Sequence, residues 1–108
     1  MKIEHTYFVY IVECIDWSYY TGITNDLEKR LWEHNTGQDE KSYTYSRRPI
    51  ELKYHEALTD VNLAIAREKQ IKGWSRKKKQ ALIAQNFDKL KEFAKSKSIS
   101  QRKNNSDK

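Results

Sequence analysis

The chain has 108 residues, of which 37% are hydrophobic, 33% charged and 12% aromatic, and its formal net charge is +6. Such a chain supports one domain with a modest core, and no run approaches the roughly 20 apolar residues of a membrane-spanning helix. Cys14 is the one cysteine, which excludes an internal disulfide, and the amino-terminal segment has no small-residue cleavage site typical of a signal peptide. A reducing cytoplasm is the expected setting, with Cys14 as a buried small hydrophobe.

The charge is unevenly distributed along the chain. Residues 1–60 carry a net charge of −4 (7 Lys and Arg against 11 Asp and Glu), and residues 61–108 carry +10 (14 against 4). Because Lys and Arg neutralise phosphates and release counterions, the basic part favours a nucleic acid, DNA or RNA, as a partner. A basic surface that serves only solubility also stays open. Nothing indicates a membrane or an obligate protein partner.

The predicted elements begin with two strands. Residues 7–15 are rich in β-branched and aromatic side chains and predict a buried strand, and residues 19–24 predict a second one. Three residues, 16–18, separate them, which is too few for a parallel crossover and indicates an antiparallel hairpin. Gly22 inside the second strand indicates a bulge or a close approach of the backbone.

A helix and a third strand are predicted next. Asn25 or Asp26 is expected to cap a helix that ends near Asn35, because a short side-chain oxygen can accept the free amide hydrogens of the first turn. Residues 36–48 are polar and expected to be irregular. Residues 50–57 then alternate between apolar and polar side chains, as a strand with one buried face does.

The last part of the chain predicts helices. Thr59 or Asp60 is expected to start a second helix, and Gly73 to end it. The remaining predicted segments are a helix over residues 76–85, a short helix over residues 87–94 and a disordered basic tail over residues 96–108. The expected fold is therefore α+β, with a small, mostly antiparallel sheet flanked by helices.

Four side chains in the first two strands and the first helix are candidates for chemistry. Tyr10 and Tyr20 could face each other across the hairpin, although strand tyrosines are usually ordinary packing residues. Arg30 and His34 are four residues apart and share one face of the first helix. A solvated helix surface is the plainer interpretation of that pair.

Glu68 is the most informative candidate. It lies four residues after Ala64 and three before Ile71, which places its carboxylate on or beside the apolar stripe of the second helix. A buried carboxylate is costly unless it is paired or binds a metal ion. Both interpretations stay open, the metal ligand and a salt bridge to Lys69, to Lys72 or to an arginine elsewhere.

A basic run with a tryptophan follows Glu68. Such a run fits a surface that tracks a nucleic-acid backbone and stacks a base, but Trp74 fits a core position equally well. The candidate nucleic-acid contacts are Arg47, Arg48, Lys72, Trp74, Arg76, Lys77, Lys78 and Lys79.

These residues together resemble the GIY-YIG nucleases, most closely their small stand-alone bacterial members. Phe8-Val9-Tyr10 and Tyr20-Thr21-Gly22 look like the paired tyrosine motifs of that family. The likeness covers roughly residues 6–85. Within this range, the segments 43–49 and 77–79 also resemble the small stand-alone members. Further matches are Arg30 to the catalytic arginine, His34 to a position filled by histidine or tyrosine, and Glu68 to the metal-binding glutamate.

The sequence departs from the family pattern at several positions. Phe8 replaces the first glycine of the motif, and Thr21 replaces its middle isoleucine. Ile23 stands where excision-repair members carry a lysine. Asn86 is the candidate for an asparagine that many members have late in the domain.

The resemblance implies a three-stranded antiparallel sheet within a domain over residues 5–86, and a metal-dependent endonuclease that hydrolyses DNA phosphodiester bonds, with structure-specific cutting in repair or recombination. One Mg²⁺ or Mn²⁺ ion, held by Glu68, would act as a Lewis acid. Tyr10 would help to deprotonate the attacking water, and Tyr20 would orient water or phosphate. Arg30 would hold the phosphate, and His34 would assist either the base or the phosphate. All five side chains should converge on one concave surface.

Two alternatives come from other classes of protein. One is a non-catalytic nucleic-acid-binding module of the same fold, which needs the basic surface but not the Glu68 carboxylate. The other is an interaction domain that binds a protein through its acidic part. A divalent ion bound at Glu68 would favour the enzyme over both.

Overall fold

The computed structural model of the chain describes residues 5–95, with side chains up to Gln85. The predicted tail over residues 96–108 and the side chain of Asn86 lie outside this part. The elements in chain order are β1 (Tyr7–Glu13), β2 (Tyr19–Thr24), α1 (Leu27–Thr36), the 3₁₀ turn η1 (Tyr45–Arg47), β3 (Glu51–Leu58), α2 (Val61–Lys72) and α3 (Arg76–Lys95). The predicted α+β class is confirmed.

The helix α3 differs from the prediction. It continues over 20 residues, where the sequence pattern predicted one helix over residues 76–85 and a separate one over residues 87–94. No glycine or proline lies between Arg76 and Lys95, so nothing interrupts the ladder of backbone hydrogen bonds. Among the described helices, none is long and apolar enough to span a membrane.

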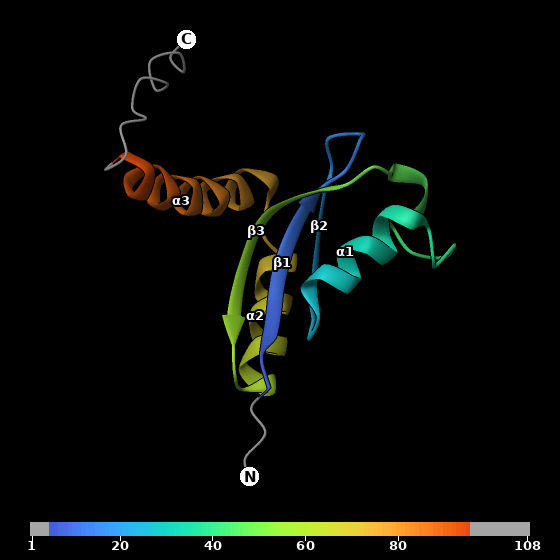
Figure 1. The fold of residues 1–108 in the computed structure, drawn as a ribbon, viewed down its shortest axis with the longest axis horizontal. Helices are drawn as coiled ribbons and strands as arrows, with labels where there is room; N and C mark the ends of the chain where they lie inside the picture. Colours follow the sequence, from blue (N-terminus) through green and yellow to red (C-terminus); the bar gives the residue numbers. More distant parts are fainter. Residues whose placement is uncertain (1–4, 96–108) are drawn as a thin grey trace.

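The three strands form one antiparallel sheet in the order β2-β1-β3, which confirms the predicted hairpin. Side chains alternate along the central strand β1. Val9 and Ile11 pack with Ala64 and Ile71 of α2, which lies behind the strands in Figure 1. The intervening residues of β1 face the other side, where Leu27 and Leu31 of α1 cover Tyr10 and Val12. The strand that carries Tyr10 is therefore buried on both faces.

Short polar side chains and a glycine set the ends of the helices that flank the sheet. Asp26 caps α1 by accepting a hydrogen bond from the amide of Lys29 at 3.1 Å, and Asp60 caps α2 through the amides of Asn62 and Leu63. Gly37 ends α1 with φ of 68°, a left-handed conformation that favours glycine. These caps fix the start and the end of the helix that carries Arg30 and His34.

Gly22 is the position in β2 that the Tyr10 side chain crosses. The two residues are opposite each other in the β1–β2 pairing. A Cβ atom added at Gly22 would lie 3.0 Å or less from the phenol oxygen and two ring carbons of Tyr10. The close approach expected at this glycine is confirmed, and it allows the Tyr10 hydroxyl to extend over β2.

We expect Gly22→Ala to lower the free energy of unfolding by about 1–3 kcal/mol, because the new methyl group overpacks a buried ring. Gly73→Ala is the matched control, since a Cβ at that glycine meets only two carbonyl oxygens at 3.7 Å. The control should stay within about 1 kcal/mol of the wild type in urea unfolding. Equal stability of the two variants would contradict the close approach.

Candidate functional site

A buried hydrogen-bond chain forms the centre of the site. The Tyr10 hydroxyl lies 2.8 Å from Nε2 of His34, and Nδ1 of the same ring lies 2.7 Å from Oγ1 of Thr44. All three side chains are buried. They come from β1, from α1 and from the loop before η1, so the chain ties three separate segments together. A solvated-surface role for His34 is therefore wrong.

Tyr20 and Tyr43 extend the site toward solvent. The Tyr20 ring centre is 6.4 Å from that of Tyr10 and 5.4 Å from that of His34, so the two strand tyrosines do face the same histidine. Tyr43 stacks on Tyr20 with ring centres 6.0 Å apart and is 41% exposed. The guanidinium of Arg47 lies over the Tyr43 ring at 3.8 Å. Aromatic and cationic groups thus line the approach to Tyr10.

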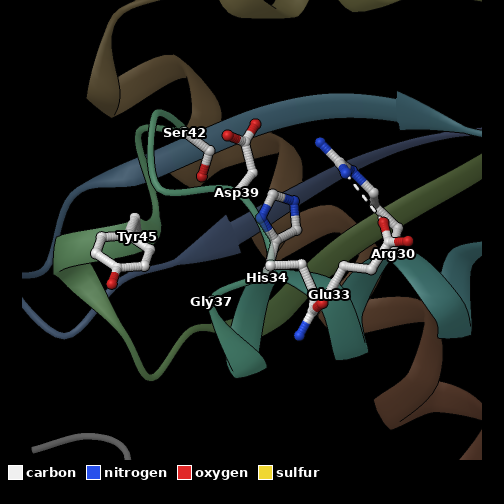
Figure 2. Close-up of a pocket in the computed structure, with 8 residues that line it drawn as sticks. Arg30, Glu33, His34, Gly37, Asp39, Ser42 and Tyr45 are labelled. Atoms are coloured by element: carbon white, nitrogen blue, oxygen red, sulfur yellow. Dashed lines mark hydrogen bonds and ion pairs between the residues drawn. The ribbon is translucent and has the colours of Figure 1, made fainter.

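Arg30 lies on the same side of α1 as His34 and is half-buried. Its guanidinium pairs with Glu33 at 3.1 Å, as the dashed line in Figure 2 shows, and it interacts with the Tyr10 phenol. Arg30, Glu33 and His34 line a small pocket with Ser42 and Tyr45 (Figure 2). The arginine is thus near the hydroxyl of Tyr10 and still partly open to solvent.

Glu68 reaches the site from the other face of the sheet. The helix α2 packs behind the sheet against β1 and the edge strand β2, and the Glu68 side chain is 13% exposed. Its carboxylate pairs with Lys72 at 3.0 Å, and the same ammonium lies 5.6 Å from the centre of the Tyr20 ring. The carboxylate also raises the pKa of Tyr10 through its charge. Glu68 therefore comes from the opposite face of the sheet to Tyr10 and Arg30, and it approaches the Tyr20 ring through Lys72 at the β2 edge. It does not line the pocket that Arg30 and His34 share, so the expected single concave surface with all five side chains is not what the described pocket shows.

The electrostatics of the buried chain favour neutral groups. Burial raises the pKa of Tyr10 to about 12, although the nearby Arg30 acts in the opposite direction. Burial, reinforced by the charge of Arg30, lowers the pKa of His34 to about 4. For Tyr10, burial therefore outweighs the lowering of the pKa by Arg30. Near pH 7 the site contains a neutral phenol beside a neutral imidazole.

The predicted nucleic-acid contacts fall into separate groups. Besides stacking on Tyr43, Arg47 pairs with Asp16 at 3.1 Å. Arg48 donates to the carbonyl oxygen of Tyr45 at 2.7 Å, and its guanidinium packs against Gly37. Arg47 thus lies beside the tyrosines, whereas Arg48 ties its loop to the end of α1.

The basic run after Glu68 is also divided. Trp74 packs against the core on the α2 side, and the ammonium of Lys78 lies 4.7 Å from its ring centre. Arg76 donates to the carbonyl oxygen of Trp17 in the β1–β2 turn and lies over the Tyr19 ring. Lys77 is exposed, and Lys79 is half-buried close to Lys72. The core alternative for Trp74 is the one that the structure supports.

Two features of the site were not predicted from the sequence. Thr44 was part of a motif match but had no assigned role, and Tyr43 was not among the candidates. Threonine and tyrosine are common in loops. No helix or strand period relates Thr44 to His34, or Tyr43 to Tyr20, in the sequence. Only the path of residues 37–49 back over α1 brings them to the site.

Known proteins share this fold and these segments. A family model described as the GIY-YIG catalytic domain matches residues 6–81. A UPF0213 protein of Bacillus pumilus is 46% identical over 80 residues, 74% of this chain and 81% of that protein. One of Haloquadratum walsbyi is 45% identical over 82 residues, 76% of this chain and 91% of that protein. The solution NMR structure of EF2693 from E. faecalis has a TM-score of 0.56 at 30% identity, covering 81% of this chain and 92% of that one.

The sheet, the flanking helices and the matched residues define a domain with a nuclease fold, whose family acts on nucleic acids. The chain belongs to the GIY-YIG family. Its relatives named above are small UPF0213 proteins, in which the shared region makes up most of the chain. The resemblance to stand-alone members of this family is confirmed.

The lowered pKa of His34 predicts a pH-dependent stability. Between pH 6.5 and about 4, the unfolded chain binds a proton that the folded chain excludes, so the free energy of unfolding falls as the pH falls. The contribution is on the order of 3 kcal/mol. In urea unfolding at pH 7 and pH 4.5, we expect a larger loss for the wild type than for His34→Gln. The control His55→Gln, at an exposed position, should follow the wild type; equal losses in all three proteins would contradict a buried neutral His34.

Proposed function

We propose that this protein is a metal-dependent endonuclease that hydrolyses phosphodiester bonds in DNA, with branched or nicked DNA as its substrates. The observation that supports this best is the grouping of Tyr10, Tyr20, Arg30 and His34 from β1, β2 and α1, with Glu68 linked to the Tyr20 ring through Lys72. Membership of a nuclease family supports the same class of reaction.

The residues at this edge fit one Mg²⁺ or Mn²⁺ ion. No group of three or more His, Cys, Asp or Glu side chains suitable for a metal occurs in the described part of the chain. Mg²⁺ does not require such a cage, because it commonly binds one or two carboxylates and fills its shell with water and phosphate oxygens. Glu68 would hold the ion, and Lys72, with a 54% exposed side chain, can turn from the carboxylate to a phosphate oxygen. When bound, the ion supplies a Lewis acid at the phosphate.

The other side chains have roles that follow from their positions. Tyr10 is a neutral phenol near pH 7, so it can take a proton from water only if it passes its own proton to Nε2 of His34. Arg30 presents a planar fork of donors that suits a phosphate and the charge that develops on it. Tyr20, between His34 and Tyr43, would orient the water or a phosphate oxygen.

A second candidate function is a non-catalytic nucleic-acid-binding module. The salt bridge between Glu68 and Lys72 favours it, because the Lys72 ammonium satisfies the carboxylate without a metal ion. In such a module the basic residues of α2 and α3 would still bind phosphates. The two functions differ in what the Glu68 carboxylate does.

Glu68→Gln keeps the shape of the side chain and removes its charge. We expect cleavage of branched, nicked and single-stranded DNA with Mg²⁺ or Mn²⁺ to fall at least about 100-fold, because the cation loses its ligand. DNA affinity in EDTA should stay near wild type or increase slightly, since a negative charge near the phosphate has gone. Glu51→Gln, at a side chain that is 74% exposed, is the control and should cut normally.

A Glu68→Gln variant that cuts as fast as the wild type would exclude the metal-ligand role. A stable wild-type protein that binds DNA but cuts none of these substrates with either ion would favour the binding module. Thermal melting of the same samples separates both results from a loss of folding. A marked fall in melting temperature would assign Glu68 a structural role with Lys72.

The basic segment after α2 predicts salt-dependent binding. We expect replacement of Lys77, Lys78 and Lys79 by alanine to weaken DNA binding for all sequences and to lower the dependence of affinity on salt concentration, because fewer counterions are released. The triple arginine variant keeps the charge and should bind like the wild type. An alanine variant that matches the wild type in both affinity and salt dependence between 50 and 200 mM salt would show that these lysines are only a solvated surface.

A further inference from the structure

Thr44 is the buried group of the site that has no role in the reaction proposed above. It lies in the loop before η1, and its hydroxyl contacts two polar groups, Nδ1 of His34 at 2.7 Å and Oγ of Ser42 at 3.0 Å. Its side chain is completely buried. A methyl group would fill the same space, so packing alone does not require an oxygen there. The hydroxyl is placed where it can determine which nitrogen of His34 carries the proton.

The neighbours of Tyr10 decide between the two tautomers of His34. Arg30 is a donor only, so it can give the Tyr10 oxygen a hydrogen bond but cannot accept the phenol proton. Among the described residues, Nε2 of His34 is the acceptor within hydrogen-bonding distance of that oxygen. With Nε2 accepting from Tyr10, the ring proton must be on Nδ1, and Thr44 Oγ1 accepts it. The Thr44 proton then points to Ser42.

We propose that Thr44 is a positioning residue, which holds His34 in the Nδ1–H tautomer and so makes Tyr10, His34 and Thr44 a proton relay for the attacking water. This inference rests on the proposed nuclease function for its catalytic part, but the tautomer itself is a property of the protein without DNA. The relay has the logic of a base that is oriented by a third group.

The proton movements balance along this chain. As the oxygen of water forms its bond to phosphorus, one water proton moves to the Tyr10 oxygen, and the Tyr10 proton moves to Nε2 of His34. The histidine becomes an imidazolium with protons on both nitrogens, and Thr44 Oγ1 continues to accept from Nδ1–H. The bond between phosphorus and the leaving oxygen breaks, and the leaving alkoxide takes a proton from solvent to become a hydroxyl group. The extra proton on His34 is later released to solvent through the pocket that His34 and Ser42 line, which restores the starting state (Figure 2).

Nitrogen-15 NMR of the His34 ring tests the tautomer directly. In the wild type near pH 7, without DNA or metal, we expect a protonated Nδ1 and an unprotonated Nε2. Thr44→Val removes the acceptor at almost constant volume, and its spectrum should shift toward the Nε2–H form. Thr44→Ser restores the hydroxyl and should restore the wild-type spectrum.

Cleavage by the same variants tests the catalytic part. For Thr44→Val we expect kcat to fall at least about 10-fold, part of the 10²–10⁴-fold that acid–base catalysis contributes, while KM and DNA affinity stay unchanged. Thr44→Ser should recover most of the rate. A similar loss in both variants would mean that Thr44 acts only through packing.

The outcomes separate this inference from the proposed function. An Nε2–H tautomer in the wild type, or identical spectra for the wild type and Thr44→Val, would overturn the positioning role whether or not the protein cuts DNA. The wild-type spectrum decides this even where Thr44→Val does not fold. If the tautomers are as expected but the wild type cuts no DNA, the nuclease function and the proton relay are both refuted. Thr44 would then keep only the role of setting the tautomer of His34.

Discussion

The hydrogen bond between Tyr10 and His34 is the interaction on which the rest of the site depends. It joins the central strand to α1 inside the core, at 2.8 Å and away from solvent. A buried hydroxyl or imidazole without a partner would cost free energy, so the two groups hold each other in place. Gly22 makes this geometry accessible, because a side chain at that position of β2 would occupy the space of the phenol.

Charged side chains lie around this neutral pair of Tyr10 and His34. Arg30 and Glu33 form a half-exposed pair on one side, and Glu68 and Lys72 form another at the β2 edge. Burial shifts the pKa of both neutral groups away from the physiological range, upward for Tyr10 and downward for His34. In the proposed reaction, a proton would move along this hydrogen-bond chain without a permanent charge in the core, and the phosphate and its counterion would meet the charged side chains at the rim.

Candidate site residues lie on both faces of the sheet and approach each other at the β2 edge. Tyr10 and Tyr20 belong to the face covered by α1, whereas Glu68 belongs to a helix on the opposite face. Lys72 links the two faces because β2 is an edge strand: its ammonium pairs with Glu68 and lies 5.6 Å from the centre of the Tyr20 ring. An edge strand with both helices beside it is thus the architectural requirement of this site, and the small domain satisfies it without further elements.

Local signals in the sequence determined the three strands and the candidate side chains, and they narrowed each helix cap to two neighbouring residues, because hydrophobic periodicity and capping act over a few residues. The structure selects Asp26 and Asp60 as the caps. The tertiary structure decided that Thr44 bonds to His34 and that the partly buried Trp74 packs against the core, since these depend on loop paths and helix packing that no local pattern encodes. It also decided the pKa of Tyr10, because the sequence reveals the nearby arginine but not how completely the phenol is removed from water.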